Sequence, residues 1–193
     1  MLFTPNFLPC VAYFQKIMEV EYININSNDI YVKQTYRNRA TILGPNKIQN
    51  LIIPVHASST KTPNKDVQID NRTPWQRTQL RTIESAYKNS TFYQYYDYLF
   101  VDLFEKKYTF LLDLQIDSLT FCLKSLQLSK TICHTGNSGE ERAVDIHAKG
   151  LSENLHFKPY LQNFGNEFVP NLSIIDLLFC MGPETLLFLR KQT

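Results

Sequence analysis

The chain has 193 residues, of which 44% are hydrophobic and 20% charged, as in a globular protein that can bury a core without disulfides or a structural metal. The net charge of +2 excludes the strongly basic nucleic-acid-binding class, because no excess of cations is present to neutralise phosphates. No apolar run approaches the roughly 20 residues of a membrane span, and the amino-terminal segment lacks the positive charge of a signal peptide. We therefore expect a cytoplasmic protein.

The amino-terminal sequence predicts a βαβ unit. Residues 2–4 read as a short strand that Pro5 ends, and residues 10–18 carry apolar side chains at the spacing of one helix face. Residues 20–25 alternate between apolar and polar side chains and predict a second strand.

A hairpin and a polar loop should follow. Residues 39–43 and 48–55 flank the turn sequence Gly-Pro-Asn-Lys at 44–47, which is typical of two antiparallel strands. The polar residues 56–64 predict a loop, and residues 65–69 predict one more short strand.

The middle of the chain predicts helices. Residues 73–76 have the pattern of a capping box with proline at the first helical position, and Leu80, Ile83 and Tyr87 form an apolar stripe behind it. The remaining predicted elements are an aromatic-rich helix from about 90 to 104, a helix over 106–128, a strand over 131–135, a loop at 136–139, and apolar helices over 174–181 and 184–191. We therefore predict a single α/β domain over residues 1–193, strand-rich in its amino-terminal half and helical in its middle and carboxyl terminus, with α+β as the alternative.

The strongest candidate for a binding site is the segment from Lys33 to Arg39. It brings together three cations and two amides, Lys33, Gln34, Arg37, Asn38 and Arg39. Such side chains bind phosphate or carboxylate groups, and arginine does so through paired hydrogen bonds. The alternative is a solvated charge cluster that precedes a strand.

A second candidate is the turn over residues 5–9, which contains Asn6 between two prolines. It joins the first predicted strand to the first helix. Ligands of α/β sheets bind beyond the carboxyl ends of strands, where the amino termini of helices offer free backbone donors. The alternative is a rigid turn without a ligand. A binding site would require this turn and the Lys33–Arg39 segment to meet in space.

The sequence gives weaker evidence for metal binding and covalent catalysis than for these two candidate binding segments. The four histidines (His56, His134, His147 and His156) lack the spacing of a metal site, so we predict no metal. The four cysteines form no CxxC pair and favour reduced thiols. No catalytic residue or cofactor can be assigned from these residues.

Four segments in order along the chain resemble the WbqC-like family of bacterial proteins in its short form. They are residues 9–17, 31–39, 69–87 and 170–183, which include Tyr13-Phe14, Asn38-Arg39, Pro74-Trp75-Gln76 and Gly182-Pro183. Members of this family lie among genes for surface polysaccharides such as O-antigen. The resemblance implies a cytoplasmic step on activated sugars, with Asn38, Arg39 and the proline-bearing turn as site features.

The resemblance and the cation-rich segment together predict a transferase acting on a nucleotide-linked sugar or another small anionic, phosphate-bearing metabolite. Lys33, Arg37 and Arg39 would hold anionic groups. Asn6, Gln34 and Asn38 would orient polar ones. The alternative is a non-catalytic accessory or scaffold protein of the same pathway; a homo-oligomer is compatible with either.

Two positions depart from the family pattern. Gln79 stands where relatives often have histidine, and His147 stands where an arginine is usual. If the histidine of the relatives is catalytic, this chain would bind its ligand without full activity.

Overall fold

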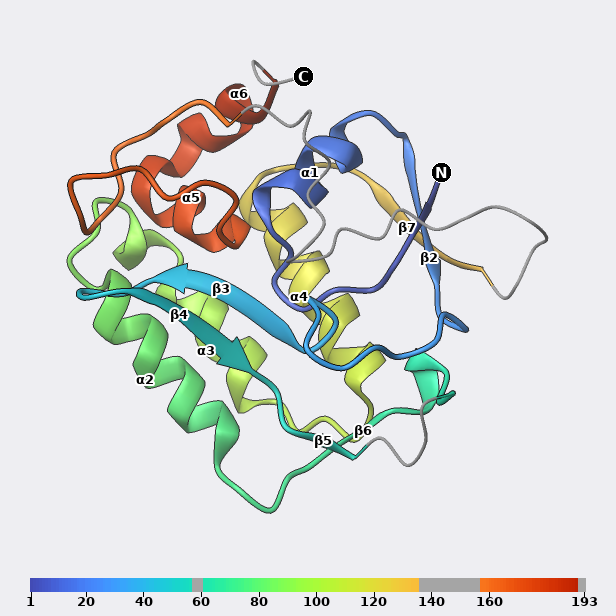
Figure 1. Cartoon of the computed structure of the whole chain (residues 1–193). Helices are drawn as coiled ribbons and strands as arrows, with labels where there is room; N and C mark the ends of the chain where they lie inside the picture. Colours follow the sequence, from blue (N-terminus) through green and yellow to red (C-terminus); the bar gives the residue numbers. More distant parts are fainter. Residues whose placement is uncertain (57–60, 136–156, 191–193) are drawn as a thin grey trace.

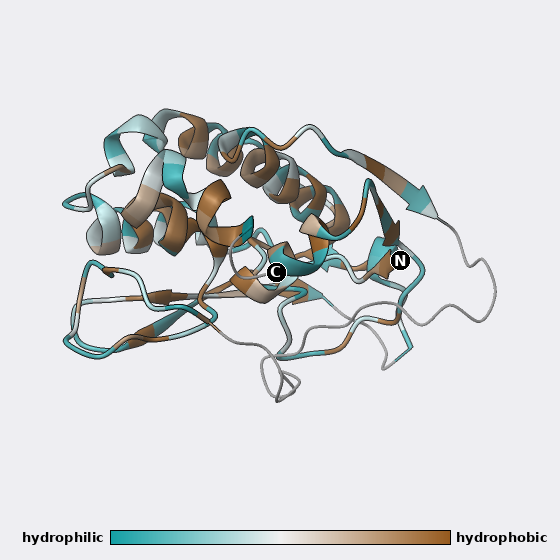
Figure 2. Ribbon diagram, turned by 90° about the horizontal axis from the view of Figure 1, so that it is seen from above, coloured by the Kyte–Doolittle hydropathy of each residue, from teal (hydrophilic) through white to brown (hydrophobic). Residues whose placement is uncertain are grey.

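A computed structural model describes residues 1–56, 61–135 and 157–190 (Figure 1). The fold is mixed α/β, as predicted. The view from above separates helices from strands (Figure 2): helices α2 (Trp75–Tyr87), α3 (Asp97–Glu105) and α4 (Leu111–Ser125) lie on one side, and the hairpin of β3 (Arg39–Leu43) and β4 (Ile48–Ile52) lies on the other. In the described part of the chain, no helix has both the length and the hydropathy needed to cross a membrane.

The parallel sheet confirms the predicted βαβ unit. Its strand order is β1 (Leu2–Phe3), β2 (Tyr22–Asn26) and β7 (Thr131–Thr135), and α1 (Val11–Met18) forms the crossover between the first two. Phe3 pairs with Ile25 and Asn26 pairs with Thr135, so the carboxyl ends of all three strands lie at one edge of the sheet. Ligand sites of α/β proteins form at such an edge.

The predicted hairpin is β3 (Arg39–Leu43) paired with β4 (Ile48–Ile52). As expected from the sequence, Pro54 limits the second strand, which ends at Ile52, because proline lacks the N–H that would continue the ladder. The chain then forms β5 (Val55–His56), which pairs with β6 (Gln68–Ile69). A short 3-10 helix η1 (Asn64–Asp66) replaces the start of the strand that we expected from residue 65.

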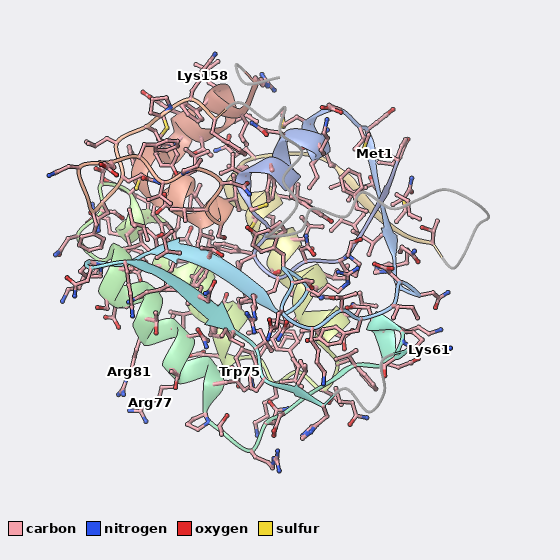
Figure 3. All side chains as sticks on the ribbon, in the orientation of Figure 1. Met1, Lys61, Trp75, Arg77, Arg81 and Lys158 are labelled. Atoms are coloured by element: carbon pink, nitrogen blue, oxygen red, sulfur yellow. The ribbon has the colours of Figure 1, made fainter. Side chains whose placement is uncertain are left out.

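Helix α2 (Trp75–Tyr87) forms without the predicted capping box. Pro74 occupies the N-cap position, and no side chain caps the helix, while Gln76 donates a hydrogen bond to Lys106 O at 2.6 Å instead. Trp75 anchors this end: it is buried, and its indole N–H donates to Asn71 Oδ1 at 3.1 Å. Figure 3 shows Arg77 and Arg81 projecting away from the molecule on the opposite face.

An aromatic core joins the middle helices. The predicted ring-rich helix is divided into a 3-10 turn η2 (Tyr93–Tyr95) and α3 (Asp97–Glu105), followed by α4 (Leu111–Ser125). Phe100 lies at the centre, with ring centroids 5.0 Å from Phe121, 5.1 Å from Phe104 and 5.9 Å from Phe179. Edge-on and tilted contacts of this kind stabilise aromatic pairs beyond the area that they bury.

The carboxyl-terminal helices complete the core. Helix α5 (Ile174–Met181) has the predicted bounds, and a 3-10 turn η3 (Gly182–Glu184) leads into α6 (Thr185–Arg190). Gly182 has φ +53°, and a Cβ at this position would lie 2.4 Å from Phe92 Cδ1, so only glycine fits. Although the stretch Leu186–Leu189 of α6 is apolar, it is not buried on every side, because Leu187 is 53% exposed.

Candidate functional site

A buried polar cluster occupies the carboxyl edge of the parallel sheet. Thr4 follows β1 directly, and its hydroxyl donates to Asp29 Oδ2 at 3.2 Å, beyond the end of β2. Arg37 Nη2 donates to the same oxygen at 2.6 Å, although only 2% of the arginine side chain is exposed. An arginine can be buried to this degree because a carboxylate compensates its charge.

The chain from β2 to β3 turns twice to bring Arg37 inside. Asp29 accepts a backbone hydrogen bond from Asn64 at 2.8 Å, which holds the first turn against η1. Gln34 adopts φ +63°, and the Thr35 hydroxyl donates back to Val32 O at 2.7 Å. This tight turn leaves residues 32–34 in solvent and directs residues 36–38 into the core.

The amino-terminal turn and the Lys33–Arg39 segment meet, as a shared site requires. Phe7 N–H donates to Tyr36 O at 2.9 Å. Asn6, immediately before this contact, is 3% exposed. Leu8 N–H donates to the Ser118 hydroxyl at 3.2 Å, so α4 supports the same turn.

Helix α4 also holds the cation-rich segment. Gln115 Nε2 donates to Arg37 O at 2.6 Å, and Gln115 Oε1 accepts from Asn64 Nδ2 at 2.6 Å. Asn38 Nδ2 donates to Ile53 O at 2.9 Å, and Ile53 N–H returns a hydrogen bond to Asn38 O at 2.9 Å. Residues from four separate regions of the chain therefore stabilise this segment.

The structure divides the six predicted residues into two groups. Lys33 and Gln34 are exposed and Arg39 is half-buried, whereas the other three are buried: Asn6, Arg37 and Asn38. Burial raises the pKa of the nearby Tyr31, and the positive charges of Arg39 and Arg37 partly offset this. The phenol therefore lies within the electrostatic reach of both guanidinium groups.

Asn6, Asn38 and Arg39 each have a buried atom without a hydrogen-bond partner among the described residues: Asn6 Nδ2, Asn38 Oδ1 and Arg39 Nε. A buried polar atom without a partner costs about 1–3 kcal/mol, so such atoms mark positions where water or a ligand binds. The set offers two donors and one acceptor.

The amino terminus of α1 does not offer the free backbone donors that we expected near the proline-bearing turn. Val11 N–H donates to Leu172 O at 3.0 Å, and Ala12 N–H donates to Asn171 Oδ1 at 2.9 Å. The carboxyl-terminal segment thus caps this helix, and an anion would have to be bound by side chains.

Sequence reasoning missed a buried carboxylate in α5. Asp176 accepts hydrogen bonds from the Tyr87 hydroxyl at 2.6 Å, the Tyr160 hydroxyl at 2.5 Å and Gln162 Nε2 at 3.2 Å. Burial raises the pKa of Asp176, while these three donors oppose the rise. The signal was a single acid within an apolar helix, but its partners lie too far away in sequence to be inferred.

Gln79 has a structural contact in this chain. Its Nε2 donates to Ile52 O at 2.9 Å, which joins α2 to the end of β4. The other departure, His147, and the predicted loop at 136–139 lie outside the described residues. Within the described ranges, no group of three His, Cys, Asp or Glu side chains is placed to hold a metal.

Two stretches of the sequence, residues 4–155 and 150–187, match the WbqC-like protein family. The chain belongs to this family. The match spans β2 and β7 of the parallel sheet, the hairpin, helices α1 to α5 and the polar cluster, and it agrees with the resemblance carried by the four sequence segments. No curated protein and no solved structure matches the chain.

Proposed function

We propose that this WbqC-like protein is a cytoplasmic enzyme of surface-polysaccharide biosynthesis, a transferase that acts on a nucleotide-linked sugar or another phosphate-bearing metabolite. The supporting observation is that Asn6, Asn38 and Arg39 each carry a buried polar atom without a hydrogen-bond partner among the described residues. Small-molecule sites contain a few polar groups supplied by separate elements, and here the turn with Asn6 meets the segment with Asn38 and Arg39 through the hydrogen bond from Phe7 N–H to Tyr36 O.

The six residues have different roles in this proposal. Arg39 and the exposed Lys33 attract the phosphate groups, and Arg39 Nε donates to one of their oxygens. Asn6 Nδ2 donates to the ligand and Asn38 Oδ1 accepts from it, which orients its polar part. Gln34 supplies a further amide at the rim.

Arg37 acts as a positioning residue, because its ion pair with Asp29 already engages its guanidinium group. The pair fixes the course of the chain on which Asn38 and Arg39 follow. The sequence led us to expect that Arg37 would hold an anionic group of the ligand; in this proposal it holds the Asp29 carboxylate instead.

An accessory or scaffold protein of the same pathway is the second candidate. The burial of Arg37 and the hydrogen bonds of Gln115 and Asn38 favour it, because these side chains stabilise the chain internally. In this case the shared segments maintain the fold, and the unpartnered atoms bind water.

Isothermal titration with UDP-N-acetylglucosamine and with inorganic pyrophosphate tests the proposed site. We expect Arg39→Gln to weaken binding about tenfold, the effect of one charge-assisted hydrogen bond. Lys47→Gln is the matched control, since it removes an exposed cation from the hairpin turn. Absence of binding to a folded protein, or equal affinity of both variants, would reject the site.

A second measurement separates the two candidates. Incubation of the protein with a nucleotide sugar and a saccharide acceptor should release the nucleotide, which chromatography quantifies. Binding without release would favour the accessory protein.

A further inference from the structure

A cleft between α3 and α4 lies outside the predicted site. Its volume is about 270 Å³, and it adjoins a second cavity of about 500 Å³ that shares Lys106, Tyr108 and Asp117. The first volume is close to the lower limit, roughly 300 Å³, of small-molecule sites. The residues that line the first cleft are Leu99, Asp102, Leu103, Lys106, Tyr108, Asp117, Thr120, Phe121 and Lys124.

Asp117 is the polar centre of the cleft. Its Oδ2 accepts hydrogen bonds from Lys106 Nζ at 2.5 Å and from the Tyr108 hydroxyl at 2.9 Å. Both bonds go to one oxygen, and no described residue is bonded to Oδ1 of the same carboxylate, whose side chain is 38% exposed. Lys106 Nζ also lies 5.0 Å from the centroid of the Tyr108 ring, within the range of a cation–π interaction.

Tyr108 remains a donor to Asp117 at neutral pH. Burial raises the pKa of this phenol, and the hydrogen bond to Asp117 and its negative charge raise it further. The carboxylate is therefore held in one orientation, and its second oxygen can accept a hydrogen bond from a ligand.

The lining combines donors and acceptors over an apolar floor. Asp102 and Asp117 accept, Lys106 and Lys124 donate, and the Thr120 hydroxyl does both. Leu103 and Phe121 are buried beneath them. Since two carboxylates face two ammonium groups, the local charge is balanced, and a phosphate would be repelled as strongly as it is attracted.

We infer that the α3–α4 cleft binds an uncharged saccharide unit, whose hydroxyl groups bridge Asp117, Lys106 and Thr120. A hydroxyl group both donates and accepts, so neighbouring hydroxyls satisfy a carboxylate and an ammonium group together. The C–H face of a sugar ring packs on the apolar floor at Phe121. The second cavity provides room for another sugar residue.

Helix α4 contributes residues both to this cleft and to the contacts that support the polar cluster at the sheet edge. Asp117, Thr120, Phe121 and Lys124 follow the three- and four-residue spacing of one face of α4. Gln115 and Ser118 make their contacts with the Lys33–Arg39 segment and the amino-terminal turn. The saccharide site stands independently of the proposed transferase activity, because it requires no nucleotide.

Saturation-transfer difference NMR on the full chain, with glucose, galactose and N-acetylglucosamine as probes, tests the inference. We expect at least one hexose to give a saturable signal at millimolar concentration. Asp117→Asn and Thr120→Val should each weaken it, the former by roughly tenfold because a charged acceptor is lost. Glu84→Gln, on the exposed face of α2, is the matched control and should leave the signal unchanged.

Thermal melting establishes that each variant is folded, and Thr120→Val serves if Asp117→Asn does not fold. The inference is overturned if no hexose gives a signal, if Glu84→Gln weakens binding as much as both cleft variants, or if only inorganic phosphate binds there. Arg39→Gln should leave hexose binding intact, so failure at the nucleotide-sugar site is distinguishable from failure at this cleft.

Discussion

The polar cluster at the sheet edge and the α3–α4 cleft differ in how their charged groups are used. In the cluster, Arg37 is 2% exposed and is engaged by Asp29. In the cleft, Lys106 and Asp117 form an ion pair of 2.5 Å, compared with 2.6 Å in the cluster, but their side chains are 58% and 38% exposed. The comparison teaches that the cations of a cation-rich sequence segment can stabilise the fold. Solvent-exposed polar groups that can bind a ligand can lie where no sequence motif is evident.

The carboxyl-terminal segment supports the polar cluster, and its removal should have the largest effect on stability. The Ser173 hydroxyl donates to Leu8 O at 2.8 Å, and Ile174 N–H donates to Pro9 O at 2.9 Å. Burial of the apolar side chains of α5 contributes on the order of 10 kcal/mol before entropy is subtracted, comparable to the net stability of a domain. Truncation after Phe168 should therefore yield unfolded or insoluble protein.

Circular dichroism and size-exclusion chromatography check this prediction. A truncated chain that melts cooperatively as a monomer would show that α5 and α6 are dispensable. The turn at residues 5–9 would then need no support from the carboxyl terminus.

Arg37→Ala should have the next largest effect. It leaves the Asp29 carboxylate, 25% exposed, without its cation and opens a cavity in the core. We expect a loss of about 3 kcal/mol in the free energy of unfolding, measured by urea denaturation. Lys33→Ala, on the exposed turn of the same segment, should change stability by less than about 0.5 kcal/mol. Similar losses for both variants would contradict the division of the segment into buried and exposed residues.

Replacement of Asp176 by asparagine tests whether a buried carboxyl group outside both regions affects the stability of the fold. Because burial raises its pKa, the folded state binds more protons than the unfolded state between the unfolded value, about 3.9, and the higher folded value. The free energy of unfolding of the wild type should therefore fall, relative to that of Asp176→Asn, as the pH rises through this window. Urea denaturation of both proteins at a series of pH values measures the difference, and parallel curves would disprove it.

Lys106→Ala should have the smallest effect on stability. Its ion pair with Asp117 is largely in solvent, so the loss should be at most about 1 kcal/mol. Lys107→Ala, the neighbouring exposed lysine, is the control for thermal melting. A loss as large as that of Arg37→Ala would mean that the cleft, like the cluster, is part of the structural framework.

Local patterns predicted most of the secondary structure. Helix α5 and strands β3 and β7 have the expected bounds, because each depends on the spacing of its own side chains and on an adjacent turn sequence. The prediction of a capping box at α2 was wrong, and the predicted ring-rich helix is interrupted at Tyr96. In both places tertiary contacts replaced the local pattern: Gln76 bonds to the end of α3, and Phe92 packs against the turn at Gly182.

The candidate site was only partly predictable. The cation-rich segment and the turn containing Asn6 were both identified from composition and position, and they do meet. Which side chains face inward was not predictable. The turn at Gln34, the acceptor Asp29 and the support from Gln115 decide it, and Gln115 is 78 residues from the carbonyl that it binds.

The amino-acid sequence by itself determined the α/β class, the order of the elements, the family and the location of the polar segment, since all of these depend on short-range periodicity and on residue type. Only the tertiary structure decided which charged side chains are buried in ion pairs and which are exposed to solvent. Arg37 and Lys33 have similar chemistry four residues apart, yet one is buried beside a carboxylate and the other is in solvent. The energy of a charge depends on burial and on its partner, and both are set by distant parts of the chain.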